Sequence, residues 1–196
     1  MSNVVVRRVE SKKDLKKFVK VPFHVHRDHP EWVPPLIMER MDFLNRKKNP
    51  YFDHAEVELL IAERDGVPVG RISVQIDDRW DEYRGGNDGQ FGFFETIDDA
   101  EVANALLDAG CEWLAGKGRE KVYGPMDFTT NDEIGIQIEG FDIRPVILEN
   151  CHQPYVKDLV EGNGFTKAMD LLMWHLEMGK LAKGLGDRAQ LNLVAS

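Results

Sequence analysis

The chain has little cysteine, no long apolar run and no export signal. Its two cysteines among 196 residues do not make a disulfide framework. A membrane-spanning helix needs about 18 consecutive apolar residues, and no such run occurs. The opening MSNVVVRRVE also lacks the apolar core of a signal peptide. The sequence therefore predicts a cytoplasmic protein with reduced thiols and no membrane partner.

Basic side chains are also in the minority. The 25 Lys and Arg residues face 34 Asp and Glu residues, for a formal charge of −9. A sequence-independent nucleic-acid binder needs a cationic face that displaces counterions, so we expect no nucleic-acid partner. Residues 1–50 still hold 12 of the basic side chains and only six of the acidic ones. The run KKDLKKFVK has helical spacing, and its lysines form either a solvated helix face or a rim that attracts anions.

What is present is enough for one globular domain. The chain is 42% hydrophobic and 30% charged, and a domain of this length buries about 70% of its unfolded surface. β-Branched or alternating runs predict strands, and amphipathic runs predict helices. The alternation at 71–76 is that of a half-buried strand, and Asp65-Gly66 before it predicts a hairpin turn. The strands are expected at 4–10, 55–63, 71–76, 90–95, 121–124, 145–150 and 168–178, and the helices at 11–28, 35–44, 98–118 and 154–164. The fold class is α/β (α+β): a mixed, mainly antiparallel sheet with helices on both faces, over residues 1–178, followed by a mobile tail at 179–196.

Several residues carry more specific expectations. Ser11 with Asp14, and Asp98 with Glu101, have the spacing of capping boxes. Gly92 inside a strand indicates a bulge or a close backbone approach. The stripe of the 98–118 helix is expected to be buried against the sheet, and it consists of Val102, Ala103, Leu106, Leu107, Trp113 and Leu114.

The order of these elements resembles a known superfamily. A three-stranded meander before LLDAGCEWLAGKG, and GNGF before a last strand, are similar to the GCN5-related N-acetyltransferases over 4–176. The runs HPEWVPPL, KNPYFDHAE, GFFE, GPMDFTTNDEIG and EGFD resemble a little-characterised bacterial branch. Members of that branch usually continue into a second domain, so this chain is either a short member or lacks its partner half. A homodimer is the other arrangement that we leave open.

The resemblance implies that acetyl-CoA or another acyl-CoA binds in a wedge between two splayed strands, at 90–95 and 121–124. Its pyrophosphate would lie at the start of the next helix, whose free N–H groups and dipole suit an anion. The cofactor-binding residues implied in this way are Phe93, Phe94, Glu101, Ala103, Asn104 and Asn150. No metal is implied.

The phosphate loop departs from the superfamily pattern. Its Q/R-x-x-G-x-G/A motif falls on Asp98, Glu101 and Ala103, and only Ala103 fits. A carboxylate about 5 Å from a pyrophosphate costs about 1 kcal/mol even with water-like screening. This departure predicts either weakened acyl-CoA binding or a helix that is capped by its own acids and holds no phosphate.

Candidate acid and base residues follow the same resemblance. The superfamily's general acid, a tyrosine five residues before the Gly-Phe pair, falls on Val160, and Tyr155 could replace it only if the helix were shifted. Glu95 closes its strand where members often place a general base, although an ordinary strand-end acid is the simpler interpretation. Asn131 and Asp132 lie in a polar run that either lines a substrate site or only forms turns.

The histidine cluster His24, His26 and His29 has residue types that can ligate a metal. On a helix, positions i and i+2 point in nearly opposite directions, so we expect surface histidines and no metal. Cys151 and His152 are adjacent in sequence, which does not make them a catalytic pair, since neighbours on an extended chain point to opposite faces.

Two function hypotheses result. The first is an acyl-CoA-dependent N-acyltransferase acting on a small-molecule amine of unknown identity, with weakened cofactor binding. The second is a non-catalytic ligand-binding or assembly module that uses the same wedge. In both, the wedge and not the histidine cluster is the expected functional site.

Overall fold

A computed structural model describes residues 4–173, and the compact unit that they build ends at Thr166. Five strands, five helices and one 3₁₀ turn form in these residues. In chain order they are β1 (Val4–Arg8), α1 (Lys12–Val25), α2 (Ile37–Phe43), η1 (Pro50–Asp53), β2 (Ala55–Arg64), β3 (Val67–Asp77), α3 (Asp78–Arg84), β4 (Asp88–Thr96), α4 (Ala100–Gly116), β5 (Lys121–Tyr123) and α5 (Val156–Gly162).

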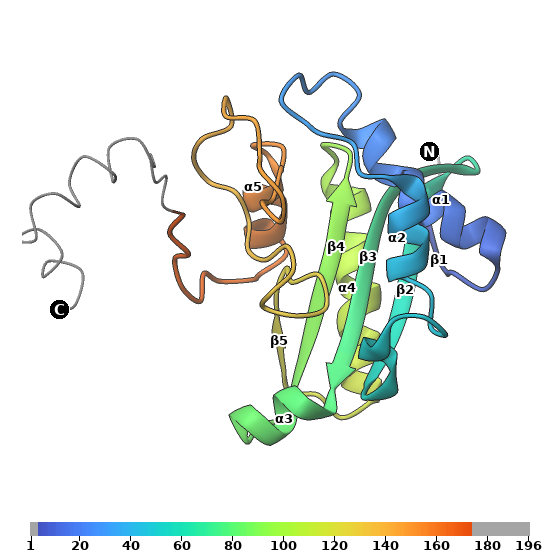
Figure 1. The fold of residues 1–196 in the computed structure, drawn as a ribbon, viewed down its shortest axis with the longest axis vertical. Helices are drawn as coiled ribbons and strands as arrows, with labels where there is room; N and C mark the ends of the chain where they lie inside the picture. Colours follow the sequence, from blue (N-terminus) through green and yellow to red (C-terminus); the bar gives the residue numbers. More distant parts are fainter. Residues whose placement is uncertain (1–3, 174–196) are drawn as a thin grey trace, which may run out of the picture. The chain divides into compact units, whose positions relative to one another are not determined.

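The strands form one sheet in the order β1-β2-β3-β4-β5 (Figure 1). The first four are antiparallel, and β5 pairs with β4 in parallel. Asp65 and Gly66 both have positive φ in the β2–β3 turn, as expected of an Asp-Gly hairpin. The predicted mixed sheet is therefore confirmed.

Each face of the sheet carries its own hydrophobic core. On one face, α4 and α5 pack their apolar residues on Ile72, Val74 and Phe91. On the other, α1 contributes Phe18 and Val19, and the η1 turn contributes Tyr51. Helices on both faces are thus confirmed. β3 was expected to be half-buried, but both of its faces are covered, because one face lies under α4 and the other under α1.

The expected cap and stripe of α4 need two corrections. The N-cap is Asp99 and not Asp98, because its carboxylate accepts from the backbone N–H groups of Glu101 and Val102. Trp113 is only partly buried, with the ammonium of Lys117 above its ring. The remaining members of the stripe are at most 1% exposed.

Some elements were predicted wrongly. Residues 145–150 form no strand, and Val146, Ile147 and Leu148 are exposed. Residues 168–173 form no strand, while the rest of the expected last strand, the boundary at 178 and the tail lie outside the described residues. The helix α3 was missed, because five of its seven residues are charged and it is too short to show an apolar stripe.

The strands β4 and β5 pair only over 88–90 and 121–123 and then separate (Figure 1). Just beyond this point β4 contains a bulge, where Phe93 has a φ of 47° and the register with β3 shifts. A Cβ atom on Gly92 would overlap the carbonyl oxygen of Met126, so the chain after β5 crosses directly over this glycine. Both features expected at Gly92 are therefore present.

Candidate functional site

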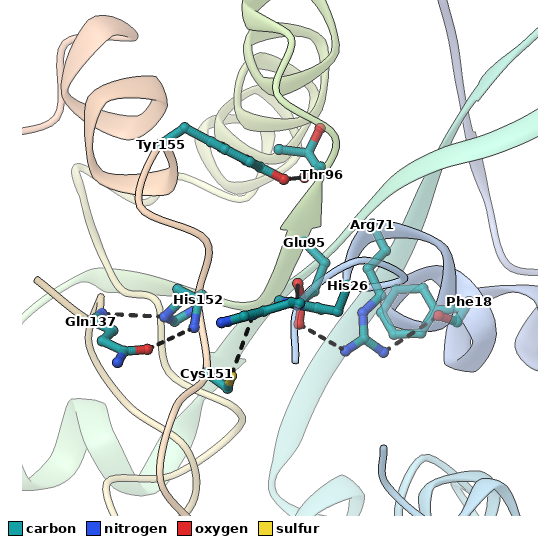
Figure 2. A network of polar contacts seen from close by, with 10 residues as sticks. Phe18, His26, Arg71, Glu95, Thr96, Gln137, Cys151, His152 and Tyr155 are labelled. Atoms are coloured by element: carbon teal, nitrogen blue, oxygen red, sulfur yellow. Dashed lines mark hydrogen bonds and ion pairs between the residues drawn. The ribbon is translucent and has the colours of Figure 1, made fainter. Parts of the chain in front are cut away.

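Polar side chains gather around the end of β4, on the face that carries α1 (Figure 2). Glu95 follows the bulge and faces His26, the C-cap residue of α1. The Nε2 atom of His26 lies 2.8 Å from the Glu95 Oε2 atom. The side chain of His26 is fully buried, and that of Glu95 is 14% exposed. A buried carboxylate and an imidazole are thus held together at the point where β4 and β5 have separated.

The histidine cluster is therefore not a set of surface residues. Only His24 is exposed, whereas His26 is buried and stacks on Trp32 with ring centroids 5.1 Å apart. The Nδ1 atom of His26 lies 3.3 Å from Nδ1 of His29, which is partly exposed. The cluster was expected to be distinct from the functional site, yet His26, at the end of α1, lies against Glu95.

Arg71 of β3 is the nearest cation to Glu95. Its guanidinium is 3.9 Å from the carboxylate and lies over the rings of Phe18 and Phe93. Burial opposes ionisation of Glu95, but the hydrogen bond from His26 and the charge of Arg71 outweigh it. The pKa of Glu95 therefore lies below its ordinary value, and the carboxylate is ionised at neutral pH.

A second buried acid lies on the other side of the bulge. Asp127 accepts a hydrogen bond from the backbone N–H of Phe93, at 2.6 Å. Burial, together with the charge of Glu133, raises the pKa of Asp127 to about 7, against the lowering effects of this N–H, Arg71 and Arg40. Glu133 itself forms an ion pair with Arg40 of α2, which ties the loop after β5 to that helix.

The loop before α5 supplies the third side of the site. Cys151 Sγ lies 3.8 Å from Nδ1 of His29. Burial raises the pKa of the Cys151 thiol to about 11, so the thiol is protonated at neutral pH. His152 is buried, which lowers its pKa, and its Nδ1 accepts from the backbone N–H of Gln137. Tyr155 donates its hydroxyl hydrogen to the carbonyl of Thr96, at 2.8 Å. Burial raises the pKa of Tyr155.

The backbone groups freed by the splay are bound by the chain itself. Besides the Phe93 N–H, the carbonyl of Phe91 accepts from Met126, and that of Thr96 accepts from Tyr155. Two pockets of the described residues do not include Glu95. One of about 380 Å³ is lined by residues 52–56, Ile76, Asp78, Lys117 and Arg119, and the other lies beside Phe91 and Val122. The strands part as expected, but loops and side chains occupy the gap.

The start of α4 is covered by an ion-pair cluster. Arg64 of β2 pairs with both Asp99 and Glu101, at 2.6 and 2.8 Å. Ala103 is fully buried, and the side chain of Asn104 accepts a hydrogen bond from Asn163. The repulsion expected from the acids at this helix start is thus partly offset by Arg64.

The other candidate residues have structural partners. Phe93 and Phe94 are each 2% exposed and belong to cores on opposite faces of the sheet. The Nδ2 atom of Asn150 donates to the carbonyl oxygens of Ile134 and Gly135. Their proposed roles in binding stay predictions.

The polar run 129–133 forms turns within itself. Asp132 accepts from the N–H and hydroxyl of Thr129, at 3.1 and 2.6 Å. Asn131 is exposed, and its N–H donates to the Thr129 hydroxyl. A role for Asn131 and Asp132 in substrate binding stays a prediction.

Sequence reasoning missed His26, Arg71 and Asp127. Arg71 lies at an alternating strand position that looks solvent-facing, and nothing local predicts that α1 covers it. The histidine triplet was the available signal, but its pairing with Glu95 spans 69 residues.

Among residues 4–173, no helix is long and apolar enough to cross a membrane. In the same part of the chain, no group of three or more His, Cys, Asp or Glu side chains is placed to hold a metal ion.

The chain is similar to known proteins in sequence and, separately, to solved structures in fold. No protein-family model matches the chain. It is 41% identical over 167 residues to a protein of Caulobacter vibrioides named Bacterial ceramide synthase. It is also 38% identical over 173 residues to Protein YghO of Escherichia coli K12. These matches cover 85% and 88% of this chain but only 44% of each relative, so the chain spans less than half the length of both.

Among solved structures, the chain matches the aminoglycoside N-acetyltransferase AAC(6')-Iy in complex with the bisubstrate analogue CoA-S-monomethyl-acetylneamine. The TM-score is 0.53 at 15% identity, covering 90% of this chain and 99% of the other. Together with the sheet order, the bulge and the splayed strands, this match confirms the expected fold.

Proposed function

We propose that this chain, which has the fold of the GCN5-related N-acetyltransferases, transfers an acyl group from acyl-CoA to an amine. The observation that carries the proposal is the buried Glu95–His26 pair at the end of β4, where that strand and β5 have separated. The matched acetyltransferase binds an analogue containing CoA, which supports an acyl-CoA ligand. We place the reaction in the cytoplasm, as the sequence predicts.

The chemistry is a direct transfer. The bound amine gives up a proton to Glu95 or to a water molecule. It then attacks the thioester carbon, so that a C–N bond forms and the C–S bond breaks. CoA leaves as a thiolate and takes up a proton. Tyr155 is protonated at neutral pH and is the candidate acid, provided that its hydroxyl leaves the Thr96 carbonyl.

A long-chain amine is the acceptor class that we propose. The relative from Caulobacter is named a ceramide synthase, and a ceramide is an N-acylated long-chain amino alcohol. The match with that relative extends over 85% of this chain, which supports the same class of acceptor here.

The test is release of free CoA thiol by the full chain, supplied with acetyl-CoA or a longer acyl-CoA and a long-chain amino alcohol. Glu95→Gln should lower the rate by about 10²- to 10⁴-fold, the usual contribution of a general base. Glu112→Gln, at an exposed acid of α4, is the matched control. An unchanged rate in folded Glu95→Gln would refute the role of Glu95.

A specific observation favours the second function, a ligand-binding or assembly module without catalysis. The start of α4 is occupied by Asp99, Glu101 and Arg64, and loops fill the gap between β4 and β5. A thermal-shift titration separates the two functions, since a ligand at about 100 times its dissociation constant adds about 2.7 kcal/mol of stability. Stabilisation by acyl-CoA without thiol release would favour the module.

Weakened cofactor binding has its own test. Replacing Glu101 by Gly and Asp98 by Arg removes negative charge from the start of α4. If repulsion by these acids weakens acyl-CoA binding, calorimetry should show tighter binding by the folded double variant. No gain would count against that explanation.

A further inference from the structure

The two nitrogens of His26 lie between two different partners. Nε2 faces the Glu95 carboxylate at 2.8 Å, and Nδ1 faces Nδ1 of His29 at 3.3 Å. An ionised carboxylate can only accept, so Nε2 of His26 carries a hydrogen and donates it to Glu95. In neutral His26 the basic nitrogen is then Nδ1, and it accepts the hydrogen carried by Nδ1 of His29.

This hydrogen-bond pattern leaves the Nε2 atom of His29 available for reaction. In neutral His29 the hydrogen is on Nδ1, so the lone pair is on Nε2, which has no hydrogen-bond partner among the described residues. His29 is partly exposed, whereas His26 is fully buried. His29 is therefore the member of the chain that can reach a substrate or solvent.

We propose that Glu95, His26 and His29 form a proton relay in which His29 takes the proton from the reacting amine. This inference rests on the proposed function. A proton arrives at Nε2 of His29, and the hydrogen on Nδ1 of His29 moves to Nδ1 of His26. The positive charge then lies on buried His26, directly beside the carboxylate of Glu95. One proton enters and one moves along the chain, and no other reactant is needed.

The surroundings favour this arrangement. Glu95 alone is a weak base, because its pKa lies below the ordinary value, whereas an imidazole oriented by a carboxylate suits proton transfer near neutral pH. Trp32 stacks on His26 and fixes its ring. The ionisable groups that face the relay from neighbouring elements are Glu31 after α1, Arg71 of β3, and Cys151 and His152 before α5.

His29→Ala tests the relay with little risk to folding, because this side chain is only partly buried. Its kcat should fall by about 10²-fold or more, with KM little changed, and added imidazole should restore part of the activity. The acidic limb of the wild-type pH–rate profile should be lost. His24→Ala is the matched control, since His24 is exposed near the end of α1 and its side chain forms a hydrogen bond only with Arg27 among the described residues.

A measurement without substrate keeps the two proposals distinguishable. Nitrogen-15 NMR of the histidine rings should show hydrogen on Nε2 of His26 and on Nδ1 of His29 at pH 8. In Glu95→Gln the uncharged amide no longer requires a hydrogen on Nε2 of His26, so the ring hydrogens should no longer be confined to these two atoms. The same hydrogen positions in folded Glu95→Gln as in the wild type overturn the relay, whether or not the protein is active. If NMR supports the relay but no acyl-CoA is consumed, only the proposed function fails.

Discussion

Replacing Asp127 by Asn should stabilise the protein, and increasingly so as the pH rises. Asp127 is buried beside Glu133, and its pKa is raised from 3.8 to about 7. Between these values the folded state holds a proton that the unfolded state has lost, so the stability of the wild type falls as pH rises through this window. The difference in pKa corresponds to about 4 kcal/mol, at about 1.4 kcal/mol for each pH unit.

The amide introduced by Asp127→Asn does not titrate, and its oxygen can still accept from the Phe93 N–H. The gain in unfolding free energy should therefore be about 1.5 kcal/mol at pH 5 and about 4 kcal/mol at pH 8. Urea unfolding at pH 5, 6.5 and 8, with wild type and variant compared at each pH, measures it. A gain that is the same at all three pH values, or a loss at pH 8, would show that Arg71 and Arg40 keep Asp127 ionised.

Three further predictions concern stability. Glu63→Gln should have the opposite pH dependence, because the hydrogen bond from Arg7 lowers the pKa of Glu63 to about 2. In urea titrations, about 1 kcal/mol of unfolding free energy should be lost at pH 7, and this loss should disappear as the pH falls from 4.5 to about 2. Leu106→Ala should cost about 2–5 kcal/mol by calorimetry, since the Leu106 side chain is fully buried between α4 and the sheet, and a cost below 1 kcal/mol would contradict this packing. Gly92→Ala should cost about 1–3 kcal/mol of stability, because its Cβ would overlap the Met126 carbonyl. Gly116 has open space around it, so Gly116→Ala should not destabilise the protein. Equal melting temperatures for the two variants would refute the close crossing.

The sequence by itself determined the elements whose rules are local. Alternation and β-branching located the strands β1 to β5, because a strand with a covered face shows a period of two. The Asp-Gly turn and the capping Ser11 lie where predicted, since a hydrogen bond within three residues defines each. Glu95 was also identified as a site candidate, but only through the resemblance to a superfamily.

Tertiary structure decided what surrounds Glu95. His26 and Arg71 reach it from α1 and β3, and contacts over such separations leave no mark in local periodicity. The covered second face of β3 and the exposed 145–150 segment were missed for a related reason: the same apolar run is a strand only where a partner strand lies beside it. The backbone groups freed at the splay found partners in the loops after β5 and before α5, because buried N–H and C=O groups must be paired and these loops cross the gap.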